Sequence, residues 1–212
     1  GEIHGVEVLA RWKHERTGYI SPTTFIPVAE KIGLINALGE WVLKTACAEA
    51  ASWATPLKVS VNVSPIQLMN TSLTDTIIEV LHQTGLDPRR LDLEITESDV
   101  FNENTRSLEI LSQLREQGIQ ISIDDFGTGY SSLSRLSYFP FDKIKIDRSF
   151  VINIPEQKDD LDIVRLIISM GKSLHMRIVA EGVETEEQLA SLQALGCDLV
   201  QGYLIGKPSP LR

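Results

Sequence analysis

Oxygen-bearing side chains recur at the ends of short apolar segments along this 212-residue chain. The clearest case is ISIDDFGTGYSSL (121–133), in which Asp124 and Asp125 stand side by side after an apolar run. Two adjacent carboxylates repel each other unless a positive charge lies close to them. Other polar residues in comparable positions are Glu7, Asn62, Glu94, Glu97, Lys145, Asp147, Glu181, Glu184 and Gln201.

The types of these residues indicate a metal site. The hard oxygen donors that would bind an ion are Glu7, Asn62, Glu94, Asp124, Asp125 and Glu181. Such a set suits Mg²⁺ or Mn²⁺ and does not suit zinc or iron–sulfur chemistry. Five carboxylates cannot all stay ionised in one pocket without cations, and a single divalent ion would neutralise only part of their charge. Two ions about 3.5–4 Å apart, bridged by an aspartate, would match phosphodiester hydrolysis, and Lys145 would polarise an attacking water or contact a phosphate oxygen.

The elements that must position these residues alternate along the chain. Apolar, β-branched segments predict strands at 5–12, 57–64, 91–96, 119–124, 142–147, 176–181 and 198–202. Helical patterns occupy 23–33, 38–53, 64–81, 104–117 and 159–174, and a further helix begins after Thr185, which forms a capping box with Gln188. This alternation predicts parallel strands joined by right-handed crossovers.

Two architectures fit such an alternation. A (β/α)8 barrel usually needs about 250 residues, so the chain is a slightly short barrel or one without its first strand. All carboxyl ends of barrel strands face the same side, and the polar residues above would therefore converge in one pocket. A doubly wound open sheet is the alternative, but it would carry a glycine-rich turn after the first strand, which GVEVLARWKHE (5–15) lacks.

The bulk composition excludes several classes. Hydrophobic residues make up 42% and charged residues 23%, as in ordinary globular proteins, and the net charge of −9 argues against a duplex nucleic-acid binder. Cys47 and Cys197 lie far apart and form no zinc spacing, so we expect reduced core thiols of a cytoplasmic protein. We find no apolar run near the roughly 20 residues of a membrane span and no signal peptide.

Seven segments together resemble the EAL-domain cyclic-di-GMP phosphodiesterases: GVEVLARW, VNVS, LEITES, IDDFGTGYSSL, KIKIDRSF, VAEGVET and QGYLIGKP. The resemblance extends over residues 3–208 in the order usual for that family. It implies a TIM-like α/β barrel with an antiparallel first strand, and that strand is missing before Gly1. It also implies a single domain, 1–212, excised from a larger signalling protein with sensor or cyclase domains.

The activity implied by the resemblance is hydrolysis of cyclic di-GMP to linear pGpG, dependent on Mg²⁺ or Mn²⁺ and inhibited by Ca²⁺. The six oxygen donors named above would bind two ions, with Asp124 bridging, and the catalytic residues would be Glu7, Lys145 and Glu181. Glu181 would act as general base or would orient metal-bound water. The residues implied to contact the nucleotide are Leu9, Arg11, Asn62, Asp147 and Gln201.

The resemblance also assigns supporting roles and leaves alternatives. Glu97 and Glu184 would lie behind the site, with Glu97 holding the loop Asp125–Ser132, and that loop with nearby helices would form a homodimer. Val8 replaces the alanine usual in the naming motif, which keeps open a catalytically inactive receptor that binds cyclic di-GMP. A different metal enzyme on a barrel, one that forms enolates, is the third alternative.

Overall fold

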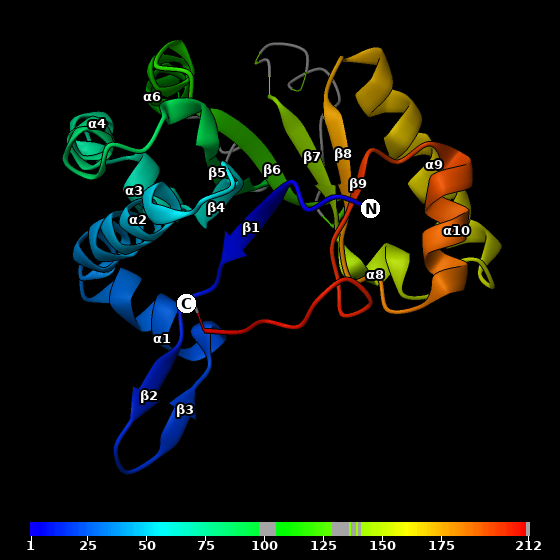
Figure 1. Ribbon diagram of the computed structural model, residues 1–212, viewed down its shortest axis with the longest axis horizontal. Coiled ribbons are helices and arrows are strands. Elements are labelled where there is room, and N and C mark those ends of the chain that lie inside the picture. The colour runs from blue at the N-terminus through cyan, green and yellow to red at the C-terminus, as the bar shows by residue number, and fades with distance from the viewer. Residues whose placement is uncertain (98–104, 129–135, 137–138, 140, 211–212) are drawn as a thin grey trace. The chain divides into compact units, whose positions relative to one another are not determined.

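The computed structural model describes residues 1–97, 105–128, 136, 139 and 141–210. The chain divides into two compact units, and we describe each by itself. The first unit comprises residues 1–94 and 104–120, and the second comprises 95–103 and 121–212. Both are built from parallel strands that alternate with helices (Figure 1).

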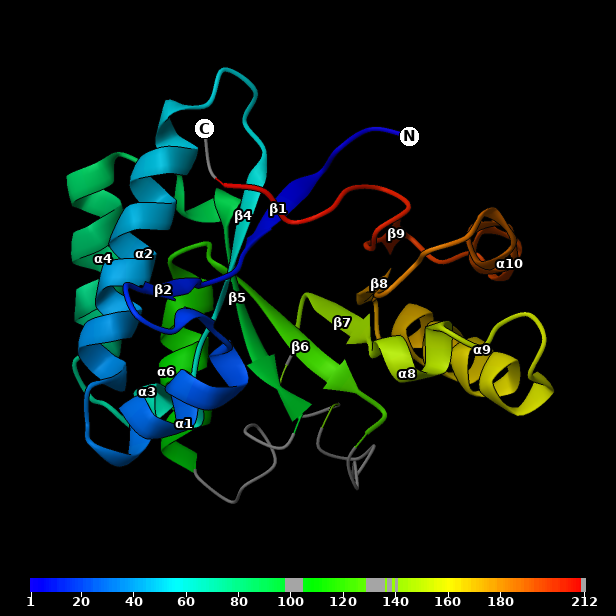
Figure 2. The same cartoon turned by 90° about the horizontal axis from the view of Figure 1, so that it is seen from below.

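The first unit contains three neighbouring parallel strands, in the order β1 (Gly5–Val8), β4 (Lys58–Asn62) and β5 (Leu91–Thr96), of which β5 continues into the second unit. A separate antiparallel hairpin consists of β2 (Trp12–His14) and β3 (Gly18–Ile20). The helices are α1 (Pro22–Lys31), α2 (Ile35–Ser52), α3 (Pro65–Leu68), α4 (Leu73–Thr84), the 3₁₀ helix η1 (Pro88–Arg90) and α6 (Thr105–Glu116). Helices α2, α4 and α6 lie together on one side of β4 and β5 (Figures 1 and 2).

The second unit contains four neighbouring parallel strands: β6 (Gln120–Phe126), β7 (Lys143–Ile146), β8 (Arg177–Ala180) and β9 (Leu199–Val200). Its helices are α8 (Arg148–Val151), α9 (Lys158–Ser173) and α10 (Glu186–Leu195). Along β6 and β7, isoleucines alternate with polar residues (Ser122 and Asp124 on β6, Lys143 and Lys145 on β7), so one face of these strands is apolar. Ile121, Ile123, Ile144, Ile146 and Ile178 are fully buried.

Most predicted elements are present, with two corrections. The predicted strand 5–12 is two strands, because β1 ends at Val8 and Trp12 already pairs with Ile20 in the hairpin. The predicted helix 64–81 is also two, since the chain turns after α3, where the side-chain oxygen of Asn70 accepts a hydrogen bond from the Ser72 N–H. The capping box at Thr185 is confirmed, with both of its hydrogen bonds to Gln188 present.

The helices of the described residues are too short or too polar to cross a lipid bilayer. The residues predicted to do chemistry lie in the carboxyl-terminal halves of the strands or follow them.

Candidate functional site

In the first unit, three adjacent parallel strands bring together three of the predicted metal ligands. Asn62 is the register partner of Glu94 in the parallel β4–β5 pair, and Glu7 is the partner of Ser60 in the β1–β4 pair. The Asn62 amide nitrogen Nδ2 donates a hydrogen bond of 2.9 Å to Glu7 Oε1. Glu94 is buried, whereas Asn62 is exposed. The unit thus presents two carboxylates and an amide in the carboxyl-terminal halves of three adjacent strands.

The same register settles the position of Val8. Val8 pairs with Val61, one residue beyond the Glu7–Ser60 pair. Successive side chains of a strand point to opposite faces. Valine at this position therefore leaves the Glu7 carboxylate and its hydrogen bond to Asn62 in place.

In the second unit, the paired aspartates lie in a β-bulge. The β6–β7 register runs from Ile123 opposite Ile144 to Phe126 opposite Ile146, so three steps on β6 match two on β7. Asp125 has a φ of 53°, a left-handed conformation that aspartate tolerates better than most residues. In a regular strand, consecutive side chains point to opposite faces. The bulge instead lets both carboxylates serve one site.

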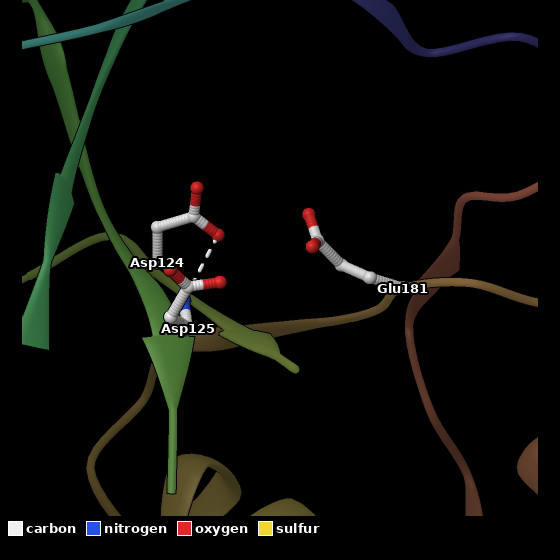
Figure 3. Close-up of side chains that lie close together, drawn as sticks. All are labelled: Asp124, Asp125 and Glu181. Carbon is white, nitrogen blue, oxygen red and sulfur yellow. Dashed lines mark hydrogen bonds between the residues drawn. The ribbon is translucent and has the colours of Figure 1, made fainter. Parts of the chain in front are cut away.

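Figure 3 shows the two aspartates facing Glu181, which follows β8. Each of the three residues offers a carboxylate oxygen, and these oxygens all lie within 4.8 Å of one another. Asp124 is buried, Glu181 is half-buried and Asp125 is exposed. The Asp125 backbone N–H also donates to Asp124 Oδ1, at 3.0 Å.

A buried lysine neutralises part of this acidic cluster. Lys145 Nζ lies 3.1 Å from Asp124 Oδ1 and 2.7 Å from Glu181 Oε1, and only 3% of its side chain is exposed. It comes from β7, between the strands that carry the two carboxylates. An ammonium group removed from water in this way is stable only when it is paired. Lys145 therefore holds the Asp124 and Glu181 carboxylates in place from within the fold.

The remaining charge at the cluster favours a cation. Partial desolvation of its carboxyl group, the neighbouring charge of Asp124 and that of Asp147 together raise the pKa of Asp125 to about 6, although Lys145 opposes the shift. A divalent ion would reverse this effect, because it stabilises the ionised carboxylates. Three carboxylates within reach of one another are ligands suited to Mg²⁺ or Mn²⁺. The residues present thus fit the predicted metal.

The other predicted residues have the following places. Leu9 and Arg11 lie exposed between β1 and β2, where Arg11 Nη1 donates to the Ala10 carbonyl. Asp147 is the N-cap of α8 and accepts a hydrogen bond of 2.9 Å from the Ser149 N–H. Gln201 directly follows β9, and its N–H donates to the Ala180 carbonyl at 2.8 Å.

Glu97, the residue predicted to hold the loop after Asp125, is buried at the end of β5. Its Oε2 accepts a hydrogen bond of 2.8 Å from the Gly127 N–H. A side chain at Gly127 would meet the Phe150 ring, and its φ of 100° requires glycine. Residues 129–135 lie outside the described residues, as does the end of the predicted loop at Ser132.

The sequence reasoning missed Arg148. Its Nη2 donates to Glu184 Oε1 at 2.8 Å, just beyond the acidic cluster. A signal for it was present in the sequence. Lys145 near the end of one strand and Arg148 after it are three residues apart, and Glu181 and Glu184 are three apart after the next strand. The β7–β8 register pairs Lys145 with Val179, so Glu181 lies two residues beyond the partner of Lys145.

The comparison with protein families gives one match, to the EAL domain, over residues 1–208. The chain belongs to the EAL domain family. A signaling protein of Caulobacter vibrioides is 55% identical over 211 residues, which are 100% of this chain and 26% of that protein. The bifunctional diguanylate cyclase/cyclic di-GMP phosphodiesterase MucR of Pseudomonas aeruginosa is 45% identical, over 99% of this chain and 31% of MucR.

Among solved structures, the EAL fold here matches the PaMucR phosphodiesterase in its c-di-GMP complex. The TM-score is 0.95 at 45% identity, covering 99% of this chain and 87% of that one. The predicted fold class, an α/β fold of the TIM-like barrel kind, is confirmed by this match. The chain spans about a quarter to a third of the length of these curated relatives.

Proposed function

We propose that this EAL domain is a metal-dependent phosphodiesterase that hydrolyses one bond of cyclic di-GMP to give linear pGpG. The observation that carries the proposal is the bulged Asp124–Asp125 pair facing Glu181 around the buried Lys145. The 45% identity to MucR, whose name includes this activity, supports the same substrate. The match to PaMucR in its c-di-GMP complex supports it as well.

The proposed metal ligands are the six oxygen donors predicted from the sequence: Glu7, Asn62, Glu94, Asp124, Asp125 and Glu181. When bound, Mg²⁺ or Mn²⁺ would activate water and stabilise charge on the attacking and leaving oxygens of the phosphodiester. Calcium, which prefers longer bonds and more ligands, would bind without the same effect.

The chain's own residues would do the rest. Lys145 would hold the attacking water or a phosphate oxygen, since its ammonium already lies between two carboxylates of the cluster. Glu181 would accept the proton of the water or orient it. Arg11 would pair with a phosphate, and Leu9, Asp147 and Gln201 would contact the nucleotide.

The decisive test is incubation of the protein with cyclic di-GMP and Mg²⁺ or Mn²⁺, with products separated by chromatography. We expect pGpG as the product. No product should form when EDTA removes the metal or when Ca²⁺ replaces it. Binding of the nucleotide without any product over hours would instead support the receptor, the alternative that Val8 raised. Turnover of a carboxylic acid with no action on nucleotides would support an enolate-forming enzyme.

Two substitutions, one in each unit, test the proposed ligands. Glu7→Ala and Asp124→Ala should each lower kcat by at least about a hundredfold, because each removes a ligand on which the ions depend. Arg165→Ala is the matched control, since it breaks only an exposed ion pair with Asp162 on α9. Wild-type rates in both ligand variants would show that the site lies elsewhere.

We further propose a cytoplasmic setting under the control of other domains. Cys47 and Cys197 are both free, as expected in a reducing compartment. MucR is named as bifunctional, with a cyclase activity besides the phosphodiesterase. A homodimer through the loop after Asp125 and nearby helices remains a proposal, which ultracentrifugation with and without cyclic di-GMP would test.

A further inference from the structure

Two short segments of the second unit lie side by side where the site is built. Residues 145–148 begin at the end of β7, and residues 181–184 directly follow β8, its parallel neighbour. The Glu181 N–H donates to the Ile146 carbonyl at 3.1 Å, so backbone joins the segments at one point. Lys145 Nζ lies 2.7 Å from Glu181 Oε1, which joins them at the metal cluster.

Arg148 makes the third connection, with both its stem and its guanidinium. Gly182, directly after Glu181, has a φ of 71°. A Cβ atom added at Gly182 would lie 2.2 Å from Arg148 Cγ, and it would also meet the Cβ and Cδ atoms of Arg148. The stem of Arg148 thus lies directly against the backbone of Gly182. Its guanidinium then reaches Glu184 at 2.8 Å.

The opposite side of the turn 181–184 is fixed by backbone alone. The Val183 N–H donates to the Gln201 carbonyl, and the Leu204 N–H donates to the Val183 carbonyl, both at 3.0 Å. A Cβ atom at Gly202 would lie only 2.2 Å from the Val183 carbonyl oxygen. The turn is therefore held between two neighbours. On one side the neighbour is the side chain of Arg148, and this contact can be removed by substitution.

We propose that Arg148 is a positioning residue for Glu181, and that it sets the carboxylate in place for metal binding by pressing on Gly182 and pairing with Glu184. This inference rests on the proposed function. The Arg148–Glu184 pair contributes little to stability, because the two side chains are 52% and 35% exposed and exposed pairs are worth about 0–1 kcal/mol. Its effect falls instead on the turn that begins at Glu181.

The test compares three substitutions at Arg148. Arg148→Met keeps most of the stem and removes the charge, Arg148→Ala removes both, and Arg148→Lys keeps a stem and a charge. Mn²⁺ affinity, measured by electron paramagnetic resonance without nucleotide, should fall about tenfold in Arg148→Ala, as is typical for residues that orient metal ligands. It should fall less in Arg148→Met and least in Arg148→Lys.

With cyclic di-GMP, kcat of Arg148→Ala should also fall about tenfold, while KM changes less than twofold. Glu184→Gln should behave like Arg148→Met. The Arg148→Met, Glu184→Gln double variant should lose no more kcat than the more impaired single variant, because both substitutions remove the same ion pair. Arg165→Met is the control, since Arg165 is similarly exposed (57%) and paired on α9. It should leave Mn²⁺ affinity, kcat and Tm unchanged.

Wild-type Mn²⁺ affinity in both Arg148→Ala and Arg148→Met would overturn the inference, as would a loss of Tm without any change in Mn²⁺ affinity or kcat. If the wild-type protein does not cleave cyclic di-GMP, the proposed function fails. The Mn²⁺ measurements would still decide the role of Arg148, because they need no turnover. The two failures are therefore distinguishable.

Discussion

The two units place their oxygen ligands by different physical means. In the first, Glu7, Asn62 and Glu94 stand on regular parallel strands, where backbone register decides their positions. In the second, a bulge, a left-handed aspartate and the buried Lys145 are all needed to bring Asp124, Asp125 and Glu181 together. The first arrangement should therefore tolerate the loss of a charge, and the second should not.

The two units should differ most in the free energy of unfolding that each loses, without metal, when one of its charges is neutralised. Lys145→Met leaves Asp124 and Glu181 facing each other with no cation, so we expect a loss of about 3 kcal/mol in the free energy of unfolding. Glu7→Gln keeps an acceptor for Asn62 Nδ2, and its cost should stay below about 0.5 kcal/mol. Urea denaturation in EDTA measures both.

A loss below 1 kcal/mol in Lys145→Met would show that the ion pairs do not hold the second unit together. Addition of Mg²⁺ or Mn²⁺ should restore part of the stability of this variant, since a bound ion replaces the missing positive charge near the carboxylates. A metal that stabilises Lys145→Met no more than a Glu181→Gln, Lys145→Met double variant would contradict that explanation.

A smaller effect is expected from the bulge itself. Asp125→Val places a β-branched side chain at a φ of 53°, which should cost about 1–3 kcal/mol. Asp125→Gly removes the same carboxylate without this strain, and should be as stable as wild type or slightly more so. Equal stability of the two variants, from thermal unfolding in EDTA, would mean that the left-handed conformation is not enforced.

The smallest expected effect is the pH dependence of stability that comes from one cysteine thiol in each unit. Burial raises the pKa of both Cys47, in the first unit, and Cys197, in the second, to about 11. Because the unfolded thiols ionise near pH 9, this contribution to stability is complete below pH 9 and is lost as the pH rises toward 11. At pH 8 the native thiols should react slowly with a disulfide reagent and rapidly in urea.

Single-cysteine variants make this a comparison of the units. Cys47→Ala leaves only Cys197, which reports on the second unit. Cys197→Ala leaves only Cys47, which reports on the first. Exposure of both thiols at the same urea concentration would indicate that the units unfold together. Exposure of Cys197 first would indicate that the charge-dependent unit is the weaker one. Rapid reaction without urea would contradict the burial of Cys47 or the partial burial of Cys197.

Elements and site residues could be predicted from the sequence where neighbours along the chain determine the local structure. The strand 91–96 was predicted with its observed bounds, because Leu91, Leu93 and Ile95 alternate along it with polar residues. The capping box at Thr185 followed from the spacing to Gln188, since a cap depends on residues three positions apart. The same holds for Glu181 and Lys145, whose types and positions at the ends of predicted strands indicated the site.

The break in the predicted strand 5–12 has a tertiary cause. The segment 5–12 carries no proline or glycine after Gly5 to mark the break at Val8, and only the pairing of Trp12 with Ile20 assigns its end to a hairpin. Gly18, with a φ of 76°, was the one local sign of that turn. The choice of partner strand is made by distant residues, which no local pattern contains.

The sequence by itself determined the order of strands and helices, the family, and the oxygen-rich chemistry at the strand ends. The tertiary structure decided how Asp124 and Asp125 come to share a face, because only pairing with β7 creates the bulge. It also decided that Arg148 lies against Gly182, because two turns meet there that are more than 30 residues apart along the chain. The sequence specifies which residues are present, whereas the orientation of their side chains depends on pairing with the neighbouring strands.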